Sequence, residues 1–361
     1  MASILSPRIL KRGLQFFVLI SAIAVVGVLV VTGAWQSTLD AFAQVQPVWL
    51  LAALLLASSD WFGGGLRIWL ITRHVHKRTP FWGMVAAGGL TAWAAYLTPA
   101  QAGGGPVMIY TMRRFGVPLP EAMASTLMSF FTTVIFFAIA GPLAIFLGAG
   151  RSLEAHQLVG ISLYDVFKTS SAMFFTVGMV MVLAVGFPGA TRRLFMAAIG
   201  WLERHHVGRV AQRVEALRTG VDRMHDCVIA YFRTLSGWLQ MFLGVLTSGL
   251  AHANRLVAGY VAMRALGLPA QFVDVLIVQT TISFLLYFAP TPGGAGAAEG
   301  LSALLMSGKT LVPGAYLPAY TIIWRFTVSY ATVIFGSFVF YKLLHGRLDE
   351  ADEGAATPQS A

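Results

Sequence analysis

Several ionisable side chains lie in or beside long apolar runs of the sequence, and four of them are considered first: Arg67, Arg255, Glu299 and Arg325. A charge at the centre of a membrane helix costs about 2.5–3.5 kcal/mol on insertion scales, so each is a candidate functional residue. The planar guanidinium of an arginine can hold two phosphate oxygens, whereas a glutamate and an arginine together can bind a zwitterion or exchange a proton. These residue types therefore indicate recognition of a charged group within an apolar environment.

Each candidate also has a structural interpretation. Glu299 and Arg325 could pin two neighbouring segments together. Arg67 and Arg255 could neutralise the carbonyls at helix C-termini or extend to a membrane interface. Asp60 lies two helical turns before Arg67 on the same helix face, so these two could form an ion relay or simply a polar cavity wall.

Two clusters of glycine and proline interrupt apolar stretches. Residues 98–106 read TPAQAGGGP and residues 289–296 read APTPGGAG. A regular helix is not expected to continue through either cluster, because proline lacks the backbone N–H and glycine is a poor helix former. The candidate binding residues in these clusters are Gly103, Gly104, Gly105, Pro290, Pro292, Gly293, Gly294 and Gly296. The limbs that follow, near 107–112 and 297–307, are too short to cross about 30 Å of hydrocarbon, so each segment is predicted to enter the membrane and return on the same side.

The two interrupted segments match each other in spacing. Tyr96, Pro99, Gly103 and Gly105 correspond to Tyr287, Pro290, Gly294 and Gly296. Arg67 and Arg255 also correspond, since each lies in the helix before its own interruption. Interrupted helices at matching places in two inverted halves indicate a transporter binding site near the bilayer midplane. Close helix packing through glycine is the simpler alternative, but it does not explain the paired prolines and arginines.

The composition sets the environment in which these residues act. Hydrophobic residues make up 57% of the chain and charged residues 11%, which excludes a water-soluble surface. The long apolar runs predict an all-α polytopic membrane protein with about six full crossings, in addition to the two re-entrant hairpins that form an inverted repeat. The predicted crossings are residues 14–31, 49–71, 122–147, 173–187, 238–261 and 315–344.

The same pattern predicts the domain organisation and the topology. The parts are an N-terminal membrane helix and outer loop (1–46), a first repeat (47–149), a connecting membrane helix (150–187), a basic amphipathic cytoplasmic linker (188–235), a second repeat (236–344) and a disordered cytoplasmic tail (345–361). Most of the 25 Lys and Arg residues then fall on the cytoplasmic side, as the positive-inside rule requires. We therefore expect a bacterial inner-membrane protein with both termini in the cytoplasm.

Two motifs carry a family resemblance. They are GGGPVMIY at 103–110, followed by RFGV at 114–117, and PTPGGAGAAEG at 290–300, followed by Arg325. In these motifs, and over roughly residues 49–344, the chain resembles the transmembrane region of lysylphosphatidylglycerol synthases and its stand-alone, flippase-like relatives. The resemblance implies movement of a phospholipid or glycolipid head group between membrane leaflets.

The chain also departs from the pattern of that family. Some relatives carry a glutamate after the first glycine cluster and an arginine in the next helix, whereas this chain has Pro106 and, near the expected arginine, Met128 and Ser129. It shows no counterpart of the soluble aminoacyl-transferase domain of the full-length synthases. We therefore expect no lipid aminoacylation and no enzyme activity.

Other functional classes remain open at this point. A membrane partner could present lipid to a separate lipid-modifying enzyme, and an ion-coupled transporter could move a small solute. An intramembrane serine protease would need Ser302, which follows Gly300 and Leu301, next to His252.

The partners expected from the sequence are membrane lipids, especially an anionic phospholipid or glycolipid. No cofactor is expected, and no nucleic-acid partner, because the net charge of +10 follows from the cytoplasmic loops. No metal site is expected either, since His74, His76, His205 and His206 lack acidic or cysteine partners at ligand spacing.

Overall fold

The computed structural model describes residues 7–149, 154, 157–158, 160–186, 189, 193, 197, 223, 225–287, 289–307 and 311–356. Within these ranges the chain is predominantly helical, so the predicted all-α fold is confirmed. A single short antiparallel pair within them joins β1 (Gln157–Leu158) to β2 (Ile161–Ser162). Most of the predicted linker 188–235, with His205 and His206, lies outside the described residues.

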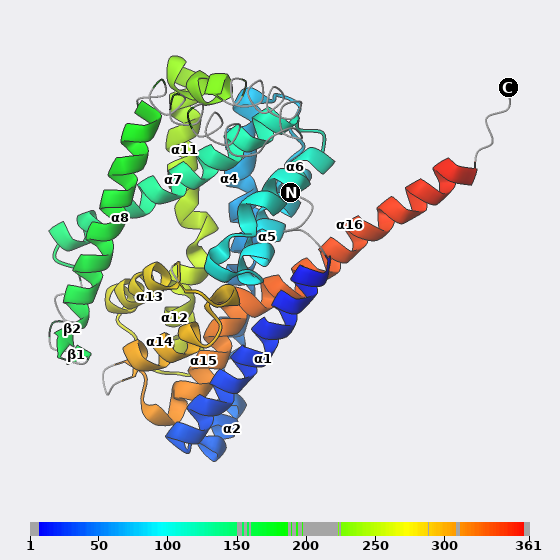
Figure 1. The fold of residues 1–361 in the computed structure, drawn as a ribbon. Helices are drawn as coiled ribbons and strands as arrows, with labels where there is room; N and C mark the ends of the chain where they lie inside the picture. Colours follow the sequence, from blue (N-terminus) through cyan, green and yellow to red (C-terminus); the bar gives the residue numbers. More distant parts are fainter. Residues whose placement is uncertain are drawn as a thin grey trace, which may run out of the picture.

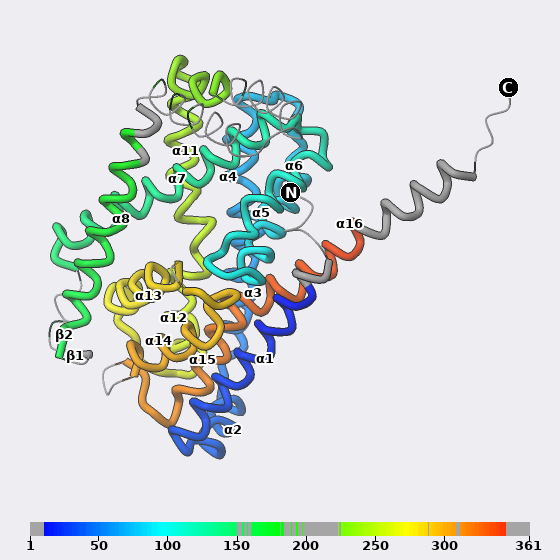
Figure 2. Tube along the Cα trace, viewed as in Figure 1, coloured from blue at the N-terminus to red at the C-terminus, as the bar shows by residue number. Residues whose placement is uncertain are grey.

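The helices follow one another in two series of similar order (Figure 1). The first series is α1 (Pro7–Thr32), α2 (Trp35–Ala43), α3 (Pro47–Ala57), α4 (Ser59–Val75), α5 (Phe81–Tyr96), η1 (Pro99–Gln101), α6 (Gly104–Arg114) and α7 (Leu119–Phe146). The second is α8 (Leu163–Gly186), α11 (Leu235–Ala251), α12 (Ala253–Ala265), α13 (Phe272–Leu286), η3 (Pro292–Gly294), α14 (Ala297–Met306), η4 (Gly314–Tyr316), α15 (Leu317–Arg325), η5 (Phe326–Tyr330) and α16 (Ala331–Ala356). Figure 2 shows the trace of α1 running beside α14 and α15, which it contacts.

Four helical stretches in the described residues are long and apolar enough to cross a membrane. They are Lys11–Thr32, Pro47–Val75, Leu119–Phe146 and Gly314–Leu343. Each overlaps one of the predicted crossings. The other two predicted crossings correspond to α8 and to the bent pair α11–α12. Large apolar side chains such as Val31 and Phe146 are exposed on these helices, which is expected of a surface that faces lipid.

Both predicted interruptions are present as breaks between short helices. Between α5 and α6 the backbone forms η1, and between α13 and α14 it forms η3. The 11 residues of α6 and the 10 residues of α14 extend roughly 15–16 Å each, about half the thickness of a hydrocarbon core. Since α6 packs on α5 and α14 packs on α13, each interruption is the tip of a helical hairpin. Entry and return on one side of the membrane stays a prediction.

The tips of the two hairpins contact each other. The N–H of Ala100 donates a hydrogen bond of 3.2 Å to the carbonyl of Ala289. Gly293 has φ +58°, and a Cβ there would lie 2.7 Å from the carbonyl oxygen of Tyr96, so glycine permits this close approach. The two interruptions thus satisfy part of each other's backbone hydrogen-bonding groups.

The two halves contain helices in a similar order, and the inversion of one half relative to the other stays a prediction. Each half contains a bent helix pair, a broken hairpin and a final long helix: α3–α4, α5–α6 and α7 in one, and α11–α12, α13–α14 and α15–α16 in the other. The bends lie at Ser58 and His252. Helix α3 packs on α12 and α4 packs on α11, so the two bent pairs run past each other in opposite chain order.

The last described helix, α16, ends at Ala356. It overlaps the disordered tail predicted at 345–361, and that tail stays a prediction. Alanine, leucine and glutamate in this stretch are favourable helix residues. Residues 357–361 lie outside the described residues.

Close packing of α4 on α5 depends on glycine, and this can be tested. A Cβ at Gly65 would lie 2.4 Å from the Cα of Val85, so we expect Gly65→Ala to lower stability by about 1–3 kcal/mol through overpacking. Gly300→Ala is the control, because a Cβ at Gly300 meets nothing within 4 Å. The measurement is the melting temperature of the detergent-purified protein. Equal melting temperatures for both variants would contradict the close α4–α5 contact.

The inverted topology can be tested by cysteine accessibility in a Cys227→Ser background, which removes the single native cysteine. Arg113 and Gln271 are exposed residues next to the first and second hairpins. We expect Arg113→Cys to react from the cytoplasm and Gln271→Cys from the outside, measured with a membrane-impermeant maleimide on inside-out and right-side-out vesicles. Labelling of both residues from one side would refute the inversion.

Candidate functional site

A cavity of about 590 Å³ lies between the first hairpin and the bent helices. Its walls come from α4, α5, η1, α6, α7 and the junction of α11 with α12, and Tyr287 of the second hairpin also lines it. This volume falls within the roughly 300–1,000 Å³ of typical small-molecule sites. The cavity is therefore the main candidate for a binding site in the described residues.

The lining of this cavity is divided into a polar end and an apolar wall. The polar end is formed by Asp60, Arg67, Gln101, His252, Arg255 and Tyr287. The apolar wall is formed by Met108, Ile109, Met123, Leu127 and Phe130 on α6 and α7. Phe130 is 53% exposed, so the apolar wall continues onto the outer surface of the protein. A molecule with a polar head and an apolar tail would match both parts.

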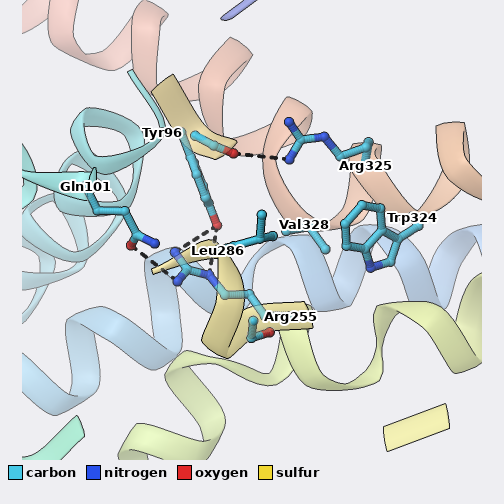
Figure 3. A pocket seen from close by; sticks show the side chains of 9 residues that line it. Tyr96, Gln101, Arg255, Leu286, Trp324, Arg325 and Val328 are labelled. Carbon is cyan, nitrogen blue, oxygen red and sulfur yellow. Dashed lines mark hydrogen bonds between the residues drawn. The ribbon is translucent and has the colours of Figure 1, made fainter. Parts of the chain in front are cut away.

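Arg255 reaches from α12 across to the first hairpin (Figure 3). Its Nε and Nη2 each donate a 3.3 Å hydrogen bond to the hydroxyl of Tyr96, and its Nη1 donates a 3.5 Å bond to Oε1 of Gln101. These bonds are at the long end of the normal range. The hydrogen-bond partners of this arginine are thus two side chains at long distance, and both belong to the other half of the protein.

Asp60 neutralises Arg255 indirectly, through Tyr96. Its Oδ2 accepts a 3.2 Å hydrogen bond from the Tyr96 hydroxyl and a 2.8 Å bond from Thr332. Tyr96 therefore donates to the carboxylate while it accepts from the guanidinium. The carboxylate is almost fully buried, with Asp60 5% exposed. This chain of contacts joins α4, α5, α12 and α16 at the edge of the cavity.

Arg67 carries a positive charge that the protein leaves uncompensated. Its Nη1 donates to the hydroxyls of Thr133 and Ser248, which are neutral acceptors. Its Nε is buried and has no hydrogen-bond partner among the described residues. No carboxylate in the described part of the chain forms a salt bridge with Arg67. Because an unpaired charge away from water is costly, this side chain is suited to receive an anion.

His252 completes the polar end and was missed as a binding candidate by the sequence analysis. Its Nδ1 lies 2.8 Å from the Ser248 carbonyl and therefore donates, and its Nε2 lies 3.1 Å from the hydroxyl of Tyr287. The available signal was an ionisable residue within the apolar run 238–261. Ser302 is not among its partners and does not line the cavity, so this arrangement gives no support to a protease-type pair.

The glycines and prolines of the interruptions divide into lining and supporting residues. Gly104 and Gly105 line the cavity together with Arg67 and Arg255. Gly103 is buried, and its N–H donates a 2.8 Å bond to the hydroxyl of Thr98.

In the second interruption, Gly293 lines a smaller adjoining pocket that also contains Arg255 and Arg325. The remaining predicted residues, Pro290, Pro292, Gly294 and Gly296, line neither space and instead shape the turn around η3.

Glu299 and Arg325 form the predicted pair. Arg325 Nε donates a 2.8 Å bond to Glu299 Oε1, and the two side chains are 1% and 0% exposed. The other glutamate oxygen accepts a 2.8 Å bond from the N–H of Gly296. Arg325 also donates bonds of 3.4 Å to the Gly293 carbonyl and to the hydroxyl of Ser21. The pair is neutral and joins the second interruption to α1 and α15, so its geometry favours a structural role. A role of this pair in binding stays a prediction.

Comparison with known proteins gives one family match. A family model described as the lysylphosphatidylglycerol synthase TM region matches residues 17–336 of the chain. The residues that line the cavity and the Glu299–Arg325 pair all lie within this range. No curated protein and no solved structure matches the chain.

The structural role of the pair predicts that removing one partner is worse than removing both. Arg325→Met leaves a buried carboxylate unpaired, and we expect a loss of about 3–5 kcal/mol in the free energy of unfolding. The double variant Glu299→Gln/Arg325→Met should recover part of this loss. Asp165→Asn is the control, because its salt bridge with Lys168 is exposed and screened by water. An unchanged melting temperature for Arg325→Met would contradict the structural role.

Proposed function

This chain belongs to the lysylphosphatidylglycerol synthase TM region family, and we propose that it moves a phospholipid or glycolipid head group between the leaflets of the membrane. The family supports a lipid-related function in the membrane. The observation that carries the proposal is the divided cavity, with cationic residues at one end and an apolar wall that reaches the protein surface.

A head group must be shielded from hydrocarbon while its acyl chains stay in it. The polar end of the cavity offers the guanidinium groups of Arg67 and Arg255 to a phosphate. The wall of Met108, Ile109 and Phe130 offers an apolar path for the first part of the chains. A water-soluble solute would leave this wall without a partner, so we favour a lipid over a small solute.

The contacts of Arg255 suggest how binding is coupled to movement. A phosphate that takes hydrogen bonds from Arg255 competes with Tyr96 and Gln101, which hold this arginine to the other half of the protein. Ligand binding would therefore favour a conformation in which the two halves are less tightly joined. Rocking of two inverted halves around a central site is the usual mode of alternating access.

The proposal includes an orientation and a cellular location. We place the chain in the bacterial inner membrane with both termini in the cytoplasm, because this arrangement puts most of the Lys and Arg residues on the cytoplasmic side. Transport is proposed rather than catalysis, since the polar end holds groups that bind and orient an anion.

The test is leaflet-resolved transport of labelled phospholipids in proteoliposomes. We expect the native chain to accelerate translocation, and Arg67→Gln and Arg255→Gln each to slow it by about tenfold or more, because a hydrogen bond to a charged group contributes about 1.5–3 kcal/mol. Arg233→Gln is the control, since Arg233 is exposed and lies outside the cavity.

Melting temperatures of all variants are measured alongside, so that loss of transport can be separated from loss of folding. Absence of translocation by the native chain across a broad lipid panel would refute transport. It would favour a membrane partner that presents lipid to a separate lipid-modifying enzyme.

A further inference from the structure

We propose that Asp60 sets the charge of the head group that the cavity accepts, so that lipids with one net negative charge are preferred over zwitterionic and dianionic lipids. The inference rests on the proposed function, because it concerns the same cavity. It assigns a specificity-determining role to a residue that the family match and the sequence motifs leave without one.

The argument begins with the charges that face the cavity. Its ionisable lining residues are Asp60, Arg67, His252, Arg255 and Tyr287. Tyr287 contributes a phenol hydroxyl, which is a neutral hydrogen-bonding group. His252 is neutral as well, because one ring nitrogen donates to the Ser248 carbonyl, the other can accept from Tyr287, and two nearby arginines oppose a third positive charge. Two arginines and one carboxylate therefore leave one net positive charge.

The neighbouring ion pair does not change this balance. Glu299 and Arg325 neutralise each other at 2.8 Å. Asp60 is the carboxylate that faces the cavity, and its Oδ2 accepts hydrogen bonds from Tyr96 and Thr332, which favour the ionised form.

One net positive charge favours a particular class of ligand. A lipid with a phosphodiester and an otherwise neutral head group brings one negative charge and makes the filled cavity neutral. A zwitterionic lipid leaves one positive charge unmatched, and a phosphomonoester with two negative charges leaves an excess negative charge. An unmatched charge is penalised strongly away from water, so charge balance should dominate the choice between head groups of similar size.

A structural role for Asp60 is the competing interpretation, and the lipid preference separates the two. Asparagine at this position keeps an oxygen that can accept from Tyr96 and Thr332 but removes the negative charge. If Asp60 only holds α4, α5 and α16 together, Asp60→Asn lowers the affinity for every lipid alike. If its charge sets specificity, the ratio between lipids changes.

The experiment measures lipid binding to the detergent-purified full chain by native mass spectrometry at pH 8. The probes are phosphatidylethanolamine, phosphatidylglycerol and phosphatidic acid with identical acyl chains, which carry about zero, one and two negative charges. For the native chain we expect phosphatidylglycerol to bind most tightly. For Asp60→Asn we expect the affinity for phosphatidic acid relative to phosphatidylglycerol to rise about tenfold.

Two further variants complete the test. Arg67→Gln removes one positive charge, so it should shift the preference the opposite way, toward phosphatidylethanolamine, and it tests the charge balance even if Asp60→Asn fails to fold. Asp40→Asn removes an exposed carboxylate on α2 and should leave every ratio unchanged.

The outcomes distinguish this inference from the proposed function. A native chain that binds lipids without preference, or variants whose ratios equal those of the native chain, would overturn the role of Asp60 and leave lipid transport standing. A native chain that binds none of the three lipids would overturn both.

Discussion

The structure depends on one constraint: backbone groups that a broken helix releases inside a membrane must find partners within the protein. The two hairpin tips meet this requirement largely with each other and with their own side chains. Ala100 donates to the Ala289 carbonyl, Gly103 donates to Thr98, and Gly296 donates to Glu299. Because the tips must touch to do this, the two hairpins that carry them, α5–α6 and α13–α14, are held together. The cavity is the space that remains beside this contact.

The charges inside the protein fall into two groups with different surroundings. Glu299 and Arg325 neutralise each other out of reach of solvent, and they hold the second interruption against its neighbours. Arg67 has no carboxylate partner in the described residues, and Arg255 meets Asp60 only through a tyrosine. The first interruption is followed by Gly104 and Gly105, which line the cavity. In the proposed function, stability and binding are thus served by different ionisable residues.

Much of the fold could be predicted because its signals are local. Apolar runs predicted the membrane helices, and the glycine and proline clusters predicted both breaks. The pairing of Glu299 with Arg325 could also be predicted, since they lie on α14 and on the next α-helix along the chain, α15. The bends at Ser58 and His252 were not predicted, because each lies inside a continuous apolar run without proline. His252 was considered only for catalysis, and its place beside the arginines depends on how α11 and α12 meet.

The sequence by itself determined that this chain is an all-α membrane protein with two interrupted hairpins, because hydropathy and backbone chemistry act over a few neighbouring residues. It also supplied the ionisable residues from which a site could be built. Only the tertiary structure decided that Arg67 and Arg255 share one cavity with Asp60, whereas Arg325 is neutralised by Glu299. The physical reason is that the effect of a buried charge depends on its neighbours in space, and those neighbours come from distant parts of the chain.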